Sequence, residues 1–530
     1  MSTPLTISPP PPAARLQRTS LKRGALLNWA SLGVQFATTF VVTPIIIHRL
    51  GQAGFGAWAL IQSFSGYYGL VNLGLGSALQ RSITHDLAAR ERQSLQTTLS
   101  TVMRFFFCTG GAVLLLALTL GHPAAAFFKV EAGATSAFAL TLALAAAAVV
   151  ADFFGSVPVA ILNACERFDL LNALNMGRQL VQTAGTLLVL ALVPSIEGVA
   201  AVIVLVSLGS LWLGFRLAGR LVPEVRFLAP GYSGACLKGL LGYGRSTVLL
   251  TLSNMVRLRF GNLIIAKFSG VAAVAGYNVA VGLITNFNNA VFAASGVLNS
   301  RFTRLKAEGK DAELHRVYRT ALFAAATISC GIGSGLLVFG EAFLHFWIRT
   351  DLPNAVPVLH VLVVAYMIAL AQAPGWNLMF AISKHHFMAR VTLVESLFNL
   401  GAGLWLSHRY GAGGFAWSTA IAIIAVKLTI QPVYAARIAG ISLQAYLEPM
   451  LAPFAVAGAL WGLCILGGTN TFLLAHSAPT LALAGIGYGV LYVGLLVLLC
   501  RRQPYMFFLP KWLRPEVGGA RIFQPTTENT

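Results

Sequence analysis

Long apolar runs follow one another along most of the chain, and they constrain its fold more than any other feature of the sequence. A helix needs about 20 apolar residues, each rising about 1.5 Å, to cross the hydrocarbon core of a bilayer. By that criterion the sequence predicts an all-α, polytopic membrane protein with about fourteen membrane-spanning helices. Their expected boundaries are 25–48, 56–80, 95–120, 135–162, 170–193, 197–219, 243–266, 272–299, 318–340, 355–382, 388–407, 412–436, 449–468 and 478–500.

The charged residues agree with this interpretation. They make up only 10% of the 530 residues, whereas ordinary soluble domains carry about 25%. The formal net charge is +20, from 37 Lys and Arg against 17 Asp and Glu. On a chain with many spans, such an excess is typical of loops that face anionic lipid. These features exclude a soluble enzyme, a disordered tail protein and a nucleic-acid-binding protein.

The distribution of basic residues predicts the orientation of the chain. Of the 37 Lys and Arg residues, roughly 27 fall in alternate loops counted from the N-terminus or at the span ends next to them, 5 fall in the opposite loops and about 5 lie well inside the expected spans. Cytoplasmic loops carry the excess of Lys and Arg, so both termini are expected to be cytoplasmic. No cleavable signal peptide is expected, because the first apolar run is a full span that follows a Pro-rich tail.

A weak internal similarity predicts how the spans are grouped. The end of the first span, Ile45–Gly51, resembles the end of the seventh, Ile264–Gly270. An even number of spans separates the two, so the copies share one orientation, which favours two six-helix bundles around a central site. Chance similarity between two apolar helix ends is the alternative. The expected division is a disordered cytoplasmic tail (1–24), an N-terminal bundle (25–219), a cytoplasmic linker (220–242), a C-terminal bundle (243–436), two extra spans (437–500) and a cytoplasmic tail (501–530).

Polar residues at helical spacing mark the first, second, seventh and eighth spans. Polar groups inside hydrocarbon are costly unless they face protein or a water-filled cavity. Because these spans occupy equivalent positions in the two halves, we expect the stripes to line a shared lumen; helix–helix packing is the alternative. The residues expected to hydrogen-bond the hydroxyl groups of a ligand are Asn28, Gln35, Asn278 and Asn289.

Charged residues inside the spans predict the sign of that lumen. Arg257 lies near the middle of the seventh span and so near the bilayer midplane, while Arg259 points to a different side of the same helix. The remaining intramembrane cations are Arg104, Arg178 and Lys427, and the acids are Asp152 and Glu395. These groups either pair with one another or line a positive lumen that attracts phosphate, pyrophosphate or acidic sugars.

Cofactor and metal chemistry is not expected. The sequence has no phosphate-binding loop and no paired carboxylates on a large external loop. Its six cysteines show no Cys-x-x-Cys spacing, so neither a disulfide framework nor a structural zinc site is predicted. We therefore expect a transporter without cofactor or metal, and not an enzyme.

Several short motifs resemble the polysaccharide-repeat flippases, the O-antigen and exopolysaccharide transporters of the multidrug/oligosaccharidyl-lipid/polysaccharide (MOP) superfamily. Their order and spacing cover about the first 300 residues. Relatives often have an acid at the position of Asn72 and another near Gly261 or Asn262, and this chain has neither. The motifs are Leu50–Trp58, Asn72–Leu79, Glu166–Asp169 with Asn172, and Leu263–Ile265 with Gly270 and Tyr277.

The resemblance implies a fold like that of the MATE transporters and a function in the bacterial inner membrane. Its implied substrate is an undecaprenyl-diphosphate-linked oligosaccharide, moved across the membrane by alternating access. The implied partners are this substrate, membrane lipids, and polysaccharide polymerase and chain-length proteins. The alternatives are a multidrug cation antiporter of the same superfamily, against which the scarcity of membrane acids argues, and a membrane polysaccharide polymerase or ligase, which needs a larger external loop.

Overall fold

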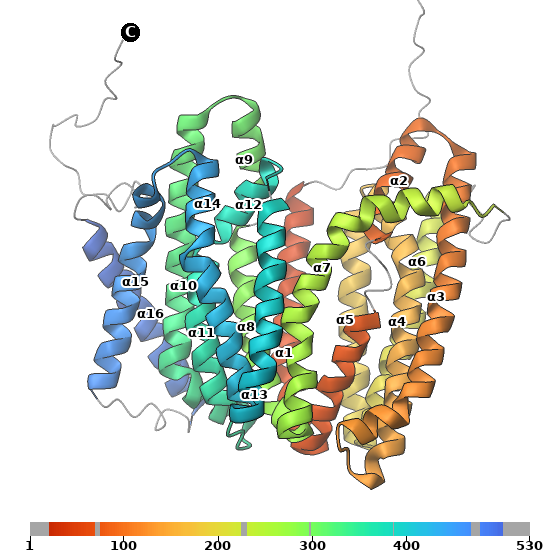
Figure 1. Ribbon diagram of the computed structural model, residues 1–530, viewed down its shortest axis with the longest axis horizontal. Coiled ribbons are helices and arrows are strands. Elements are labelled where there is room, and N and C mark those ends of the chain that lie inside the picture. Colours follow the sequence, from red (N-terminus) through yellow and green to blue (C-terminus); the bar gives the residue numbers. More distant parts are fainter. Residues whose placement is uncertain are drawn as a thin grey trace, which may run out of the picture. The chain divides into compact units, whose positions relative to one another are not determined.

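The computed structural model describes residues 21–68, 75–223, 231–295, 298–384, 386–467 and 477–501. Within these ranges it describes the side chains of all residues except 21–32, 67–68, 77, 132 and 243–259. The described residues form α-helices, one 3₁₀ helix and short irregular segments, and they form no strands (Figure 1). The all-α fold predicted from the sequence is therefore confirmed.

The helices follow one another with short connections. Those before residue 230 are α1 (Leu21–Tyr68), α2 (Leu75–Ala89), α3 (Arg92–Phe127), α4 (Thr135–Ala164), α5 (Phe168–Leu192) and α6 (Ile196–Leu221). Those after it are α7 (Gly234–Ser269), α8 (Val271–Ser295), α9 (Leu298–Ala307), α10 (Asp311–Ile348), α11 (Ala355–Ala371), α12 (Ala373–Ala381), α13 (His386–Leu428), α14 (Ile430–Ala439), α15 (Leu443–Leu466) and α16 (Ala478–Cys500).

The helices are long and apolar enough to cross a membrane many times. In the part of the chain that the structure describes, nine helices meet this criterion, and the bent pair α11–α12 makes a tenth. Helix α1 has 48 residues and α13 has 43, about twice what one span needs. Both are broken, at Gly51 and Gly411, between expected neighbouring spans. The total of about fourteen spans stays a prediction.

Two glycines in the similar segments adopt nearly the same backbone conformation. Gly51 has φ 71° and ψ 177°, and Gly270 has φ 83° and ψ 165°. A positive φ of this kind is open to glycine and strained for residues with a Cβ. The glycines therefore end their helices in the same way at corresponding positions, which is consistent with an internal repeat.

The chain forms two compact units whose segments alternate along the sequence. Unit 1 contains the described residues of Met1–Gly282, Trp347–Val358 and Ala389–Ala422. Unit 2 contains those of Leu283–Phe346, Leu359–Met388 and Ile423–Thr530. The division expected from the sequence, with bundles at 25–219 and 243–436, follows the chain order and stays a prediction.

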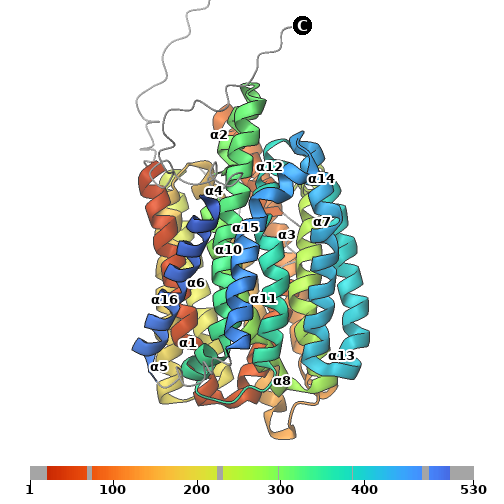
Figure 2. The ribbon, with the colours of Figure 1, turned by 90° about the vertical axis from the view of Figure 1, so that its left-hand side faces the viewer.

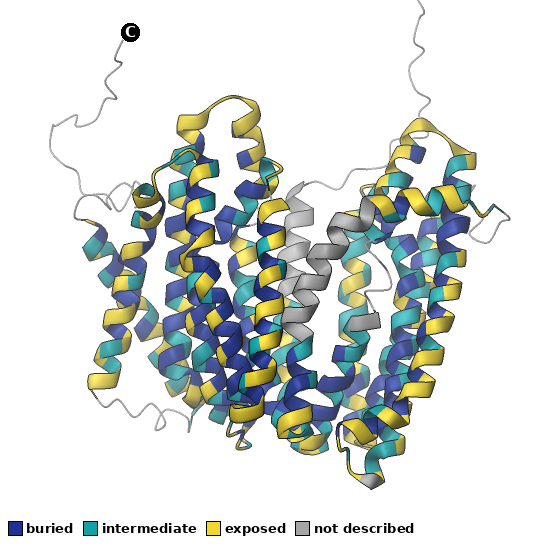
Figure 3. Ribbon diagram, in the orientation of Figure 1, coloured by how far each residue is buried: buried dark blue, intermediate teal, exposed yellow. Residues whose placement is uncertain are grey.

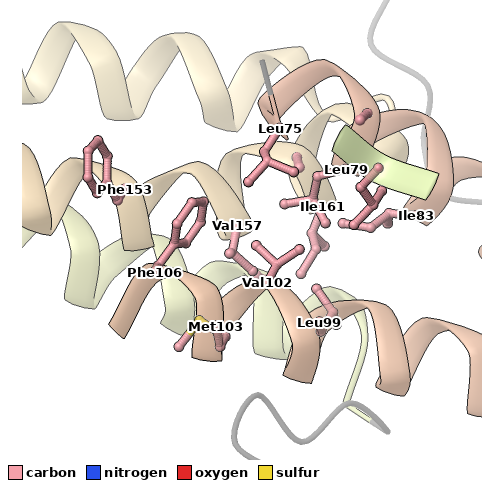
Figure 4. Packing of buried hydrophobic residues seen from close by; sticks show 14 of the residues in the cluster. Leu75, Leu79, Ile83, Leu99, Val102, Met103, Phe106, Phe153, Val157 and Ile161 are labelled. Carbon is pink, nitrogen blue, oxygen red and sulfur yellow. The ribbon is translucent and has the colours of Figure 1, made fainter. Parts of the chain in front are cut away.

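The core of unit 1 lies between α2, α3 and α4. Phe106 of α3 stacks on Phe153 of α4 with ring centroids 5.8 Å apart, and Leu79 of α2 and Val157 of α4 are fully buried nearby (Figure 4). In the same unit, Gly56 of α1 approaches α8 so closely that a Cβ there would collide with the carbonyl oxygen of Val271. Small residues permit such close helix packing in membranes.

In unit 2, α15 and α16 lie beside α10 and α11 (Figure 2). The Tyr492 hydroxyl of α16 donates to the Thr327 carbonyl of α10 over 3.1 Å. The Ser329 hydroxyl of α10 donates to the Met367 carbonyl of α11 over 2.9 Å. These bonds satisfy hydroxyl groups inside an otherwise apolar bundle, where an unsatisfied polar group is costly.

Large apolar side chains cover the exposed surfaces of the helices. Four leucines, Leu115 and Leu118 of α3 and Leu451 and Leu463 of α15, are each more than half exposed. Exposed residues recur along the length of both helices (Figure 3). Soluble proteins rarely expose contiguous apolar surfaces of this extent. The exterior therefore fits hydrocarbon, and the protein is a multi-pass membrane protein.

Candidate functional site

Two helices of unit 2 are broken next to a proline. Helices α11 and α12 meet at Gln372 with a bend of 40°, and Pro374 follows in the first turn of α12. Helices α13 and α14 are separated at Thr429, and Pro432 lies in the first turn of α14. A proline has no N–H and cannot continue the helical hydrogen bonds of the preceding turn. Broken helices of this kind commonly form the binding sites of transporters.

Buried polar side chains connect the two breaks. The Gln372 Nε2 donates to the Lys427 carbonyl at the end of α13 over 2.8 Å. The Lys427 ammonium donates to Gln431 Oε1 over 2.5 Å. The Tyr446 hydroxyl of α15 donates to Gln372 Oε1 over 3.0 Å. All four residues are buried, so this network, the Lys427 site, fixes α12, α13, α14 and α15 at one point of unit 2.

The ammonium group of Lys427 also lies 5.7 Å from the centre of the Trp376 ring of α12. The electron-rich face of an indole attracts a cation, more so away from water. Lys427 is only 6% exposed, and a buried cation in a membrane protein is a marker of a functional site. The site therefore presents a positive charge within apolar surroundings.

A cavity of about 470 Å³ opens beside the Lys427 site. Its volume lies within the range of about 300–1,000 Å³ that is usual for ligand pockets. The residues around it are almost all apolar, and among them Lys427 supplies the charge and Gln372 the amide. The others are Ser334, Leu337, Val364, Met367, Ile368, Leu428, Pro432, Leu447, Met450, Leu451, Phe454, Ala457, Gly458 and Trp461. Such a cavity can hold an apolar chain next to an anionic group.

Arg178 and Asp152 form an ion pair in unit 1. The two guanidinium nitrogens of Arg178 on α5 lie 2.8 and 3.0 Å from the carboxylate oxygens of Asp152 on α4. The guanidinium also donates to the Ser207 hydroxyl of α6 over 2.9 Å. Arg178 lines a cavity of about 390 Å³ between α5 and α6. Arg178 and Asp152 therefore pair with each other, and a role of Arg178 in a positive lumen stays a prediction.

Asn278 belongs to a second network in unit 1. Its Nδ2 donates to Asn262 Oδ1 of α7 over 2.8 Å, and the Asn262 amide donates to the Ser63 hydroxyl of α1 over 2.8 Å. Asn262 and Ser63 are buried. Asn278 therefore connects α1, α7 and α8, and its expected contact with a ligand stays a prediction.

The other expected residues lie apart from the Lys427 site. Glu395 is buried in the part of α13 that belongs to unit 1; one turn later, Asn399 accepts hydrogen bonds from Ser418 and Thr419. Arg104 of α3 and Gln35 of α1 are exposed. Asn289 is half-buried in the unit 2 part of α8. A single lumen shared by these residues stays a prediction.

Some of the expected residues fall outside the part of the chain whose side chains are described. They are Asn28, Asn72, Arg257 and Arg259. The residues of the Lys427 site that were not predicted from the sequence are Gln372, Trp376, Gln431 and Tyr446. A usable signal was present, because Gln372 and Gln431 each stand within two residues of a proline inside an apolar run, and interrupted helices point to binding sites.

The resemblance motif Glu166–Asp169 forms the turn between α4 and α5. The Arg167 guanidinium donates twice to the Asp169 carboxylate, from Nε and from a terminal nitrogen, each over 2.9 Å. These charge-assisted bonds lower the pKa of the Asp169 carboxyl to about 2. The motif therefore has a structural role at the start of α5.

The fold is similar to those of a lipid flippase and a multidrug transporter of known structure. The structure is similar to the lipid II flippase MurJ in an inward closed conformation, with a TM-score of 0.70, 12% identity, and coverage of 91% of this chain and 99% of that one. It is also similar to an inward-facing multidrug resistance MATE family transporter, with a TM-score of 0.61, 15% identity, and coverage of 84% and 97%. At these identities the likeness concerns the fold alone, and the expected MATE-like fold is confirmed.

The sequence identifies the family. Residues 21–306, more than half of the chain, match the family described as polysaccharide biosynthesis protein, and the chain belongs to this family. It is 21% identical over 490 residues to the uncharacterized membrane protein EpsK of Bacillus subtilis (strain 168), covering 89% of this chain and 94% of that protein. It is 22% identical over 417 residues to the "Putative O-antigen transporter" of Shigella flexneri, covering 77% and 96%. The resemblance to MOP-superfamily polysaccharide flippases is therefore confirmed.

Proposed function

We propose that this protein is a flippase, which moves undecaprenyl-diphosphate-linked oligosaccharide repeat units across the bacterial inner membrane by alternating access, for surface polysaccharide biosynthesis. Both termini are cytoplasmic in this proposal. The protein carries out no covalent chemistry. The polysaccharide polymerase and chain-length proteins that use the transported unit are its proposed partners.

The observation that carries the proposal is the position of Lys427 at the edge of the 470 Å³ apolar cavity. A lipid diphosphate combines a long hydrocarbon chain with a compact, strongly negative group. The cavity offers an apolar surface for part of the chain, and the ammonium offers a charge-assisted hydrogen bond to a phosphate oxygen. The names of the relatives support the same substrate class, since one is an O-antigen transporter and a structural neighbour is a lipid II flippase.

The multidrug cation antiporter is the second candidate, and the cavity does not favour it. A cationic drug needs a negative or aromatic surface, and repulsion from an ammonium in a low-dielectric site opposes its binding. Among the described residues that line the cavity, the charged one is Lys427. The positive charge at the cavity therefore favours an anionic substrate over a cationic drug.

The test compares three forms of the purified protein in liposomes: the wild type, Lys427→Gln and Lys427→Arg. The substrate is a fluorescent polyprenyl-diphosphate sugar, and the readout is its rate of movement between leaflets. Losing a charge-assisted hydrogen bond is worth about 1.5–3 kcal/mol, so Lys427→Gln should slow transport about tenfold to a hundredfold. Lys427→Arg, which keeps the charge, should retain most of the rate.

Two results would overturn the proposal. One is a wild-type protein that moves a fluorescent organic cation but not the lipid-linked sugar, which would establish the antiporter. The other is a Lys427→Gln protein that transports at the wild-type rate, which would remove the carrying observation. Equal amounts of folded protein in each liposome preparation, measured by gel filtration before reconstitution, make the rates comparable.

A further inference from the structure

A proline in α1 leaves one carbonyl group without its usual helical partner. The carbonyl of residue 40 would accept a hydrogen bond from the N–H of residue 44, but Pro44 has no N–H. A polar backbone group that is not satisfied in an apolar environment is costly. The Phe40 carbonyl therefore lacks the backbone N–H donor of residue 44 and can accept a hydrogen bond from another helix.

Trp347, at the end of α10, supplies a donor. Its indole N–H donates to the Phe40 carbonyl oxygen over 2.7 Å. The Trp347 ring also meets the Phe40 ring edge-on, with ring centroids 5.3 Å apart. One side chain thus makes both a polar and an apolar contact with the same turn of α1.

Trp347 is the first residue of a short segment, Trp347–Val358, that belongs to unit 1, although the parts of α10 before it and α11 after it belong to unit 2. We call this segment the strap. It has a second bond to unit 1, because Gln52 Nε2 donates to the Asp351 carbonyl over 2.7 Å. It also passes close to α8, where a Cβ on Gly276 would lie 3.3 Å from the Ala355 nitrogen.

We propose that Trp347 is a positioning residue of the transport cycle, and that its bond to the carbonyl freed by Pro44 holds the strap on α1. This inference rests on the proposed alternating access. Since both ends of the strap continue into unit 2, a movement of unit 2 relative to unit 1 either breaks the bonds of the strap to α1 or bends the chain where the strap joins α10 and α11. The bond to Phe40 therefore sets how easily the strap leaves α1.

Two substitutions distinguish the role of the indole N–H from that of the indole ring. Trp347→Phe keeps an aromatic ring and removes the donor. Pro44→Ala restores a backbone N–H at residue 44, which can satisfy the Phe40 carbonyl within the helix. If the donor is what matters, Pro44→Ala should therefore reduce the cost of Trp347→Phe, and the two substitutions should be strongly non-additive.

The experiment measures amide hydrogen exchange in peptides that cover residues 347–358 of the full-length protein in detergent micelles. In the Pro44 background, Trp347→Phe should speed strap exchange about tenfold, as expected when one hydrogen bond that holds a segment closed is lost. In the Pro44→Ala background, the same substitution should change exchange less than about threefold. Trp405→Phe is the matched control: this exposed Trp of α13 stacks under the Arg409 guanidinium, and its replacement should leave the strap unchanged.

An equal effect of Trp347→Phe in both backgrounds would show that Trp347 acts only by packing, and would overturn the proposal. So would unchanged exchange in Trp347→Phe alone. If Trp347→Phe does not fold, Gln52→Ala tests the same proposal. Loss of the Gln52 bond to the Asp351 carbonyl should also speed amide exchange in the strap. An unchanged exchange rate would contradict a strap that is held on α1. Amide exchange requires no substrate. The experiment therefore tests the hold of Trp347 on α1 even if the proposed transport function proves wrong, and the two failures can be told apart.

Discussion

Arg178 and Lys427 show two ways in which a single cation is accommodated inside an apolar helix. Arg178 has a carboxylate partner, Asp152, in a two-point contact. Lys427 donates to a neutral amide oxygen and lies near the face of an indole. Arg178 is thus paired with an acid, whereas Lys427 lies at the edge of the apolar cavity of unit 2. This difference makes Lys427, and not Arg178, the better candidate for contact with an anionic ligand.

The ion pair predicts a non-additive effect on stability. Asp152→Asn should lower the thermal unfolding temperature of the purified protein by several degrees, because it leaves a guanidinium without a counter-charge inside an expected membrane span. Adding Arg178→Gln should recover much of that loss, since the double variant has no uncompensated charge. The measurement is a set of unfolding curves in detergent for the wild type, both single variants and the double variant.

An exposed ion pair provides the control. Asp311 lies 2.8 Å from Lys306 between α9 and α10, and both side chains are more than half exposed. Asp311→Asn should hardly change the unfolding temperature, because exposed pairs contribute little. Additive effects of the Asp152 and Arg178 substitutions would show that the pair is not energetically coupled.

The sequence identifies Arg178 and Asp152 as charges inside the expected spans, but it does not indicate that they pair with each other. Helical spacing indicates which residues of one helix share a face, whereas a distance between two helices depends on how they pack. The same limit explains why Gln372 and Tyr446 were missed: their bond joins residues 74 positions apart. The sequence therefore predicts which polar groups lie in the expected spans, whereas the packing of the helices determines which group each of them contacts.

At the scale of the elements, apolar length predicts the helices well and the breaks less well. Every expected span falls on helical residues, apart from short stretches at breaks and at residues that the structure does not describe. The break at Gly51 coincides with an expected loop. The break at Gln372 lies inside the expected span 355–382, because a count of apolar residues does not register a proline that interrupts the backbone hydrogen bonds.

The contact between α1 and α8 predicts a strict requirement for glycine at one position. Gly56→Ala would place a Cβ against the Val271 carbonyl oxygen, which is backbone and cannot rotate away. We expect it to destabilise the protein by about 1–3 kcal/mol or more and to reduce its abundance in the membrane. Gly76→Ala on α2 is the control, since a Cβ there meets nothing within 4 Å. Abundance by immunoblot and unfolding temperature check both; equal behaviour of the two variants contradicts the contact.

At the scale of the whole molecule, the two compact units do not follow the order of the chain. The boundary between them crosses α8 after Gly282 and crosses α13 after Ala422. The internal similarity indicates which segments of the chain resemble each other, whereas the two units are defined by which segments pack together. The similarity therefore does not indicate where the units divide, and the like-oriented halves stay a prediction.

The charge bias predicts the placement of the chain ends. Alkaline phosphatase fused to the C-terminus should be inactive, because the enzyme folds only outside the cytoplasm and both termini are expected inside. The same enzyme inserted after Lys129, in the turn between α3 and α4, should be active. Activity on intact cells is the measurement, with expression of both fusions checked by immunoblot. An active C-terminal fusion would contradict the even number of spans.

Every side chain of the Lys427 site and of its cavity belongs to unit 2. A molecule held by these groups alone therefore meets the same surroundings whichever way the units are arranged. Equal affinity for two arrangements shifts no population, however tight the binding. If the protein transports a lipid diphosphate as proposed, binding at the Lys427 site alone therefore favours neither side of the membrane. The direction of transport then has to come from contacts of the ligand with unit 1, or from an external driving force that acts on unit 1.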